Sequence, residues 1–423
     1  MLLLPFVVSF FLYSIPYIVP AFCFLHLVAL VPIMISSYTQ PLRFKQGLLW
    51  GCAVLSVQLS WSLVMLIGYQ FSITIACFWL LCILALSLYV GIWFVVQSYL
   101  QAHIGWFFSW CFSSLVFFSF MTYGCLFVFG VCEGYPLFNP CILWAYYPSL
   151  LQGVYYLHMG GMITWWIIIQ LCIAGMIIDN RNRFRYFCIG SCILLFYGYL
   201  CFQSSHIEKS VLRNTACLAP TWWFTHKDPI SSGYAMVHEV NQIVQKQPEV
   251  QFLCMSESCF NWNIHEYPQF LEIMSEDAPD VAIGLCCHQK KESGLASSFI
   301  ILQHGAITFS YDKMHLIPFM ERAVPGFETL LHNEAYFIYG DHNQNDIVMI
   351  QGKPFQVYIC SEFLFETKKP KGVPILFLCN DAWLTVPFAK AWVPLFVTYF
   401  EKRYRVPVYY STVCGTHNIG ITP

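Results

Sequence analysis

Long apolar runs fill the first half of the chain, and short apolar runs separated by polar residues follow in the second half. A helix needs about 20 apolar residues to cross a bilayer. On that basis, the pattern predicts membrane spans near residues 1–15, 17–36, 48–68, 72–98, 105–130, 161–178 and 187–203. The first two could instead form one hairpin around Pro16 and Pro20. We therefore expect residues 1–203 to form a membrane domain of about seven helices.

Beyond residue 203 the apolar runs have the length of strands. They are rich in Val, Ile, Phe and Cys, as buried strands are. They lie at 250–255, 280–287, 298–303, 346–350, 355–360 and 374–379. Amphipathic helical patterns lie near 231–246 and 390–403. This alternation of strands and helices predicts an α/β layered domain over residues 204–423.

The distribution of charge supports this division. The chain is 58% hydrophobic and 10% charged, whereas in soluble proteins about a quarter of residues are charged. The first 203 residues carry only Arg43, Lys45, Glu133, Asp179, Arg181, Arg183 and Arg185 as charged side chains. The second half carries 16 basic and 21 acidic side chains and no basic tract, which argues against a nucleic-acid partner.

The basic residues of the first half also predict an orientation. Arg43 and Lys45 lie between the second and third predicted spans, and Arg181, Arg183 and Arg185 lie between the sixth and seventh. With seven spans these two loops fall on one side, which the positive-inside rule makes cytoplasmic. We therefore expect the domain after residue 203 on the opposite, extracytoplasmic face of the membrane.

Cysteine is abundant, but its spacing indicates no metal or cofactor site. Of the 20 cysteines, 12 precede residue 203, where they serve as small apolar side chains. The eight later ones show no CxxC spacing. The run Cys286-Cys287-His288 lacks a second pair of ligands at the spacing of known zinc sites. We expect neither a metal nor a cofactor.

Three residues near the ends of predicted strands could perform thiol chemistry together. Glu257 follows the run that ends at Met255, Lys313 lies in YDKMHLIPFMER, and Cys360 closes FQVYIC. Glu257 could take the thiol proton, Cys360 could attack a carbonyl carbon, and Lys313 could lower the thiol pKa and stabilise the oxyanion. Alone, however, a cysteine at a strand end is more often a packing residue, and spacing does not join the three.

A resemblance joins them. The segments MSES, YDKMHLIPFMER, YICSEFLF and FLCNDAWL resemble the four sequence blocks of the nitrilase (carbon–nitrogen hydrolase) superfamily. The pattern K-x-H-L-I-P-F-x-E, from Lys313 to Glu321, and the multispan domain ahead of it resemble the apolipoprotein N-acyltransferase family. The motifs lie between residues 251 and 385.

The resemblance implies a four-layer α-β-β-α sandwich on the periplasmic face of the bacterial inner (cytoplasmic) membrane. It also implies a membrane N-acyltransferase with a Glu257–Lys313–Cys360 triad. Phospholipid would donate an acyl chain to Cys360 as a thioester. The N-terminal amine of a diacylglyceryl-cysteine lipoprotein would accept it. Because donor and acceptor are both lipids, a multispan domain suits this activity better than the hydrolysis of a small soluble amide.

Further residues take roles from the same resemblance. Glu321 and Glu362 fall on the supporting carboxylates of the family. Glu362 would polarise the site or hold Lys313 in place. Trp222 or Trp223 would stand near the substrate-facing tryptophan of the family.

Two departures from the family keep alternatives open. Ser361 follows the candidate nucleophile where the acyltransferases usually carry an aromatic residue. The sequence also ends at Pro423, so we expect it to lack the closing strands and last membrane span of the family. One alternative is a non-catalytic or accessory paralogue, such as a conjugal-transfer membrane protein. The other is a membrane-tethered nitrilase-like amidase, with water as the acceptor.

Overall fold

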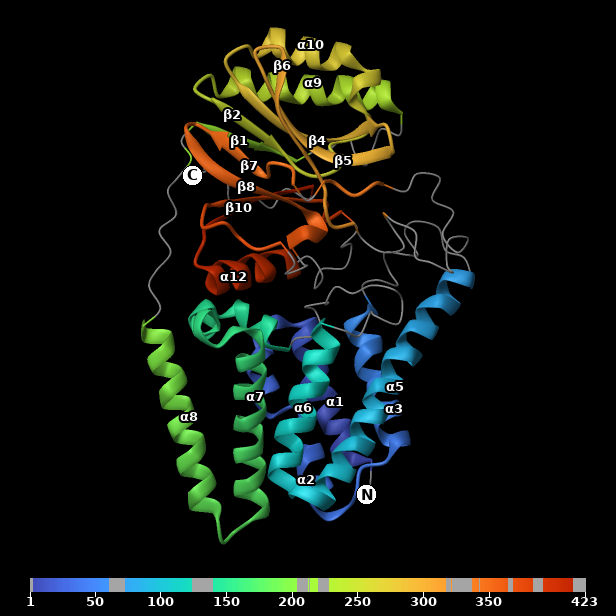
Figure 1. Ribbon diagram of the computed structural model, residues 1–423, viewed down its shortest axis with the longest axis vertical. Helices are drawn as coiled ribbons and strands as arrows, with labels where there is room; N and C mark the ends of the chain where they lie inside the picture. Colours follow the sequence, from blue (N-terminus) through green and yellow to red (C-terminus); the bar gives the residue numbers. More distant parts are fainter. Residues whose placement is uncertain are drawn as a thin grey trace. The chain divides into compact units, whose positions relative to one another are not determined.

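The computed structural model divides the chain into two compact units (Figure 1). The first unit comprises Met1–Val128, Cys132–His206 and Trp383–Arg405, and the second comprises Phe129–Val131, Ile207–Ala382 and Val406–Pro423. The structure describes residues 3–60, 73–123, 140–203, 212, 214–219, 228–316, 321, 337–341, 343–363, 368–382 and 391–413.

The first unit is helical in its described parts. Its α-helices are α1 (Leu4–Ile18), α2 (Val31–Thr39), α3 (Phe44–Gln58), α5 (Ile73–Ile104), α6 (Trp106–Tyr123), α7 (Val154–Ile178), α8 (Arg183–Gln203) and α12 (Trp392–Tyr404). Three 3-10 helices accompany them, η1 (Pro20–Val28), η4 (Pro140–Tyr146) and η5 (Pro148–Leu151). Each of the seven predicted spans overlaps one or more of these helices.

Four helical segments among the described residues are long and apolar enough to cross a membrane, fewer than the seven spans predicted. They are Pro20–Thr39, Trp79–Ile104, Gly160–Ile178 and Arg183–Gln203. Leu4–Ile18 and Trp106–Met121 are apolar but shorter. Large apolar side chains remain exposed on the span Arg183–Gln203, including Leu195 and Phe202. Such a surface suits lipid rather than water.

Close backbone approach and internal hydrogen bonds hold the helices of the first unit together. A Cβ added at Gly47 of α3 would lie 2.7 Å from the carbonyl oxygen of Val90 in α5, so α3 and α5 pack backbone to backbone. Between α5 and α6, the Gln97 amide donates to Ser109 Oγ (2.9 Å) and accepts from Ser113 Oγ (2.7 Å). Small residues and buried polar pairs of this kind hold helices together in an apolar solvent.

Helix α12 packs within the first unit, although the sequence-based division placed its residues in the second domain. The Trp392 ring stacks on Tyr17 of α1, with 5.7 Å between the ring centroids. Just past the end of α12, the Arg405 guanidinium lies 3.6 Å from the centroid of the Tyr155 ring and donates to the Tyr156 hydroxyl (2.9 Å). Along the sequence, the chain therefore returns to the helical unit after Ile207–Ala382, which make up most of the second unit.

The described residues of the second unit form two sheets (Figure 1). The six-stranded sheet has the order β1 (Thr215–Leu218), β2 (Phe252–Met255), β4 (Ala282–Lys291), β5 (Gly294–Gln303), β6 (Ala306–Asp312), and β3 (Phe260–Asn263) also pairs with β4. The four-stranded sheet has the order β10 (Val408–Thr412), β9 (Ile375–Cys379), β8 (Lys353–Ile359), β7 (Ile347–Ile350). The pairs β1–β2, β2–β4, β8–β9 and β9–β10 are parallel.

Helices α9 (Pro229–Lys246) and α10 (Pro268–Asp277) cover the face of the six-stranded sheet that is turned away from the other sheet (Figure 1). Asp228 caps α9 by accepting a hydrogen bond from the Ser231 backbone N–H (2.8 Å), as expected of a carboxylate at a helix N-terminus. Three layers of the second unit lie among the described residues: helices α9 and α10, the six-stranded sheet and the four-stranded sheet. The fourth, helical layer of the expected sandwich stays a prediction, because α12 belongs to the first unit.

All six predicted strands are present, as β2, β4, β5, β7, β8 and β9. The patterns at 231–246 and 390–403 are the helices α9 and α12. The sequence did not predict β1, β3, β6, β10 or α10. Strand β6 alternates between exposed and half-buried residues up to Ser310, so it forms no continuous apolar run.

The α3–α5 contact yields a prediction about stability. Gly47→Ala should lower the unfolding free energy by about 1–3 kcal/mol, because the added methyl group meets rigid backbone rather than a movable side chain. Gly198→Ala in α8 is the matched control, since a Cβ there meets nothing within 4 Å. Thermal unfolding in detergent would measure both. Equal melting temperatures for the two variants would contradict the packing described.

Candidate active site

The three predicted catalytic residues each follow the end of a strand. Glu257 lies two residues after β2, Lys313 directly follows β6, and Cys360 directly follows β8. All three side chains are buried. They come from both sheets of the second unit, so the fold brings together positions that the sequence separates widely.

The Lys313 ammonium lies between two carboxylates. Its Nζ is 2.9 Å from Oε1 of Glu257 and 2.7 Å from Oε1 of Glu321. Burial alone lowers the pKa of Lys313, but the charges of Glu257 and Glu321 outweigh burial and hold that pKa well above the ordinary lysine value. Lys313 is therefore a permanent buried cation at neutral pH.

The second oxygen of Glu257 is also fixed. Its Oε2 accepts a hydrogen bond from the backbone N–H of Asn380 (3.0 Å), just beyond the end of β9. With Lys313 on one oxygen and Asn380 on the other, the carboxylate has a defined orientation. Asn380 lies in the FLCNDAWL segment, but its contact with Glu257 was not predicted.

Cys360 adopts an unusual backbone conformation. Its φ is +45°, in the left-handed region that residues with a side chain rarely adopt. Two side chains hold the backbone around it. Glu362 Oε2 accepts from the Ile359 backbone N–H (2.8 Å), and the Ser361 hydroxyl donates to the carbonyl oxygen of His315 (2.5 Å). Strain of this kind is common where a fold must present one reactive side chain.

The pKa of the Cys360 thiol is raised, whereas the sequence analysis expected Lys313 to lower it. A hydrogen bond with Cys379 lowers the pKa of the Cys360 thiol, but burial and the charge of Glu257 raise it more. Lys313 lowers this pKa, as the sequence suggested, yet the net pKa is raised. The resting side chain is therefore a neutral thiol, and a base has to remove its proton during attack.

Glu362 connects the segments that carry Lys313 and Cys360. Its Oε1 accepts from the Tyr311 hydroxyl and from the Met314 backbone N–H, both at 2.6 Å. Its Oε2 accepts from the Ile359 backbone N–H. Met314 follows Lys313 and Ile359 precedes Cys360, so one buried carboxylate ties both segments together. The supporting role of Glu362 at the site stays a prediction.

A second buried lysine was missed by the sequence analysis. Lys368 Nζ lies 2.6 Å from the Tyr311 hydroxyl, 3.5 Å from Glu362 Oε2 and 3.7 Å from Asp346 Oδ2. Burial lowers the pKa of Lys368, against the opposing charges of Glu362 and Asp346. Nothing in the run ETKKPKG distinguishes it from the solvent-exposed lysines beside it.

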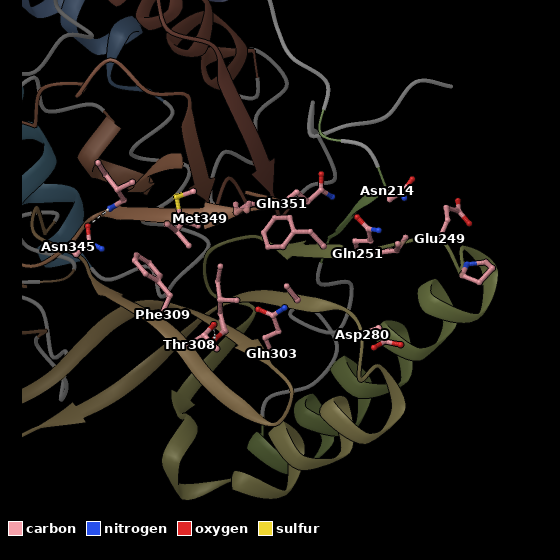
Figure 2. A pocket seen from close by; sticks show the side chains of 18 residues that line it. Asn214, Glu249, Gln251, Asp280, Gln303, Thr308, Phe309, Asn345, Met349 and Gln351 are labelled. Atoms are coloured by element: carbon pink, nitrogen blue, oxygen red, sulfur yellow. Dashed lines mark hydrogen bonds between the residues drawn. The ribbon is translucent and has the colours of Figure 1, made fainter. Parts of the chain in front are cut away.

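A cavity in the second unit is a different feature (Figure 2). Its volume is about 800 Å³, and its lining includes Asn214, Gln251, Gln303, Met349 and Gln351. It touches the first residues of β2 and β4, whereas Glu257 follows the last residue of β2. None of the predicted site residues that the structure describes lines it.

Trp222 and Trp223 lie outside the described residues. Within the described part of the chain, no group of three or more His, Cys, Asp or Glu side chains could hold a metal ion.

Comparisons with known proteins place the chain among distant neighbours. No family model and no curated protein matches its sequence. Several solved structures that resemble it are proteins of the carbon–nitrogen hydrolase (nitrilase) superfamily. A carbon–nitrogen hydrolase from Helicobacter pylori G27 is 12% identical, with a TM-score of 0.33, over 44% of this chain and 69% of the other.

Two further solved structures resemble this chain to about the same extent. A CN-hydrolase superfamily protein from Xanthomonas campestris is 15% identical, with a TM-score of 0.31, over 48% of this chain and 74% of the other. A nitrilase superfamily member from Saccharomyces cerevisiae is 13% identical, with a TM-score of 0.31, over 44% of this chain and 71% of the other. At such low similarity, function has to be inferred from the residues of this chain.

The raised pKa of Cys360 predicts a pH dependence. Alkylation of Cys360 by iodoacetamide should reach half its maximal rate above the ordinary thiol pKa of about 8.5, because only the thiolate reacts. Peptide mass spectrometry across pH 6–11 would follow this residue alone, with N-acetylcysteine as the reference. A midpoint below about 8.5 would show that Lys313 dominates the thiol instead.

The Lys368 network predicts a difference between two lysines. Lys368→Met should lower the unfolding free energy by about 3–5 kcal/mol, because it removes the cation beside the buried Glu362 carboxylate. Lys371→Met is the control. Lys371 contacts the other oxygen of Asp346 from a half-exposed position, so its loss should cost about 1 kcal/mol or less. Similar melting temperatures for both variants would contradict the network.

Proposed function

We propose that the chain is a membrane N-acyltransferase. It would move an acyl chain from phospholipid, through a Cys360 thioester, to the N-terminal amine of a diacylglyceryl-cysteine lipoprotein. The observation that supports this most is the Lys313 ammonium held between Glu257 and Glu321, with its charge acting on the buried Cys360 thiol. A fixed buried cation beside a neutral thiol and a carboxylate suits acyl transfer through a thioester.

The first half-reaction forms the thioester. Glu257 accepts the Cys360 proton while Sγ attacks the ester carbonyl carbon of the phospholipid. Lys313 stabilises the negative oxygen of the tetrahedral intermediate. The intermediate collapses by breaking the bond to the glycerol oxygen, which takes the proton back from Glu257 and leaves as lysophospholipid.

The second half-reaction transfers the acyl chain. The acceptor amine attacks the thioester carbonyl carbon and gives a proton to Glu257. The bond between carbon and Sγ breaks, and the sulfur regains a proton as the amide product leaves. In this scheme Glu362 and Lys368 take no part in bond making, because their described contacts are with backbone, with the Tyr311 hydroxyl, with Asp346 and with each other.

The chain also has four described helical segments that are long and apolar enough to cross a membrane. Their presence supports a substrate that is itself a lipid. We propose that the protein resides in the bacterial inner membrane with its second unit on the periplasmic side. The basic loops at Arg43–Lys45 and Arg181–Arg185 support this orientation through the positive-inside rule. Phospholipid and a lipoprotein acceptor are then reachable from one membrane face.

Intact mass spectrometry tests the first half-reaction. Wild-type protein incubated with phosphatidylethanolamine or phosphatidylglycerol vesicles should gain one acyl group that hydroxylamine removes. Cys360→Ala should gain none, and Cys217→Ala, which changes a thiol elsewhere in the second unit, should behave as wild type. Lys313→Ala should form the adduct about 10²–10³-fold more slowly. An adduct of equal size and rate in all four proteins would contradict the assignment.

A synthetic diacylglyceryl lipopeptide then tests the acceptor. The acyl group should move to a free N-terminal amine and should stay on the enzyme when that amine is acetylated. Release as free fatty acid in both cases would identify a hydrolase with water as the acceptor. No adduct with either phospholipid would favour the accessory, non-catalytic alternative.

A further inference from the structure

An arginine just past the end of α12 packs on two tyrosines at the start of α7. The Arg405 guanidinium lies 3.6 Å from the centroid of the Tyr155 ring and donates to the Tyr156 hydroxyl at 2.9 Å. That hydroxyl in turn donates to the carbonyl oxygen of Gln203, the last residue of α8, at 3.3 Å. All of these residues belong to the first unit. Arg405, Tyr155 and Tyr156 are called the arginine cluster below.

The arginine cluster lies at one end of two apolar helical segments. Helix α8 runs for 21 residues from Arg183 to Gln203, which is about 30 Å and matches the thickness of the hydrocarbon core of a bilayer. In a membrane, the cluster therefore stands where hydrocarbon meets headgroups. Tyr155 and Tyr156 are 36% and 41% exposed, and exposed tyrosines are common at this level.

The charge of Arg405 is not neutralised within the described part of the chain. No described carboxylate forms an ion pair with its guanidinium. An arginine side chain has five N–H donors, and among the described residues only the Tyr156 hydroxyl accepts from them. A guanidinium that stacks on an aromatic ring and keeps further N–H donors suits the bidentate binding of a phosphate.

The backbone of Arg405 is also unusual. The residue has φ +54° and ψ +37°, the left-handed conformation in which helices usually end on glycine. An arginine at such a position indicates that its side chain has a role that glycine cannot fill. That role is either packing between α12 and α7 or the binding of an anion, and the two can be separated by experiment.

We propose that the arginine cluster binds the phosphate group of a phospholipid. The guanidinium donates to the phosphate oxygens, while the Tyr155 ring holds its plane and the Tyr156 hydroxyl holds one edge. A phospholipid fits better than a free anion because an apolar surface adjoins the cluster. Phe202, next to Gln203, is 86% exposed and offers a contact for an acyl chain. The inference rests on the proposed membrane location and not on the chemistry of Cys360.

Native mass spectrometry of the full-length protein in detergent tests this site. Phosphatidylglycerol is compared with diacylglycerol of the same acyl chains, which lacks the phosphate. Arg405→Gly removes the guanidinium and suits the left-handed backbone, and Arg405→Gln keeps a polar side chain without the charge. Lys402→Gln is the control, because it removes a positive charge from the last turn of α12 outside the cluster. Thermal unfolding identifies the variants that are folded.

The wild type should retain phosphatidylglycerol more tightly than diacylglycerol. Both Arg405 variants should retain phosphatidylglycerol about tenfold more weakly than the wild type, because charged hydrogen bonds to the phosphate are lost. Their retention of diacylglycerol should equal that of the wild type. Lys402→Gln should behave as the wild type with both lipids.

Several results would overturn the inference. A wild type that does not prefer phosphatidylglycerol to diacylglycerol would do so without any variant. Equal retention of phosphatidylglycerol by the wild type and a folded Arg405 variant would show that the arginine only packs. An equal loss in Lys402→Gln would indicate a general effect of charge. Inorganic phosphate retained by the wild type in place of phospholipid, and lost in Arg405→Gly, would identify a site for free anions.

Lipid retention requires no acyl transfer, so it can fail or succeed separately from the proposed activity. A wild type that retains phosphatidylglycerol through Arg405 but forms no acyl adduct would refute the acyltransferase and leave this site intact. A wild type that forms the adduct but retains lipid independently of Arg405 would do the reverse.

Discussion

The buried ammonium of Lys313 is the interaction on which the candidate site depends. Removing a cation from water costs several kcal/mol, which close and well-oriented anions have to offset. Glu257 and Glu321 do so at 2.9 and 2.7 Å. Because Glu257 is also held by Asn380, the same charge fixes the end of β2 against the end of β9. The candidate site is therefore part of the packing between the two sheets.

A second buried lysine repeats this arrangement nearby. Lys368 lies among Glu362, Asp346 and the Tyr311 hydroxyl, and Glu362 in turn holds the backbone beside Lys313 and Cys360. The two clusters have different tasks. The first places charge next to the thiol, and the second keeps the backbone that carries the thiol in its left-handed conformation. Together they explain why so many charged groups tolerate burial in this unit.

The sequence was most informative where one physical rule decides the structure. Continuous apolar runs identified six strands, because a strand buried on both faces has few polar residues. Strand β6 was missed because exposed positions interrupt it, and strand β3 because two asparagines interrupt its apolar residues. The buried position of Lys368 depends on contacts from Tyr311 and Asp346, which are distant in sequence. The apolar face of α12 showed that it would be buried, but not that Trp392 would stack on Tyr17 within the helical first unit. Glu257, Lys313 and Cys360 were joined only by resemblance, and their catalytic roles stay predictions.

A double-mutant cycle on Lys313→Met and Glu257→Gln tests most directly whether a shared buried charge organises the site. The unfolding free energies of the wild type, both single variants and the double variant would be measured in detergent. Lys313→Met leaves Glu257 buried without its cation, and Glu257→Gln leaves Lys313 with Glu321 as its one remaining described carboxylate. The double variant should therefore lose less than the sum, by about 1–3 kcal/mol. Losses that add within about 0.5 kcal/mol would show that the two groups do not depend on each other, and would contradict this account of the site.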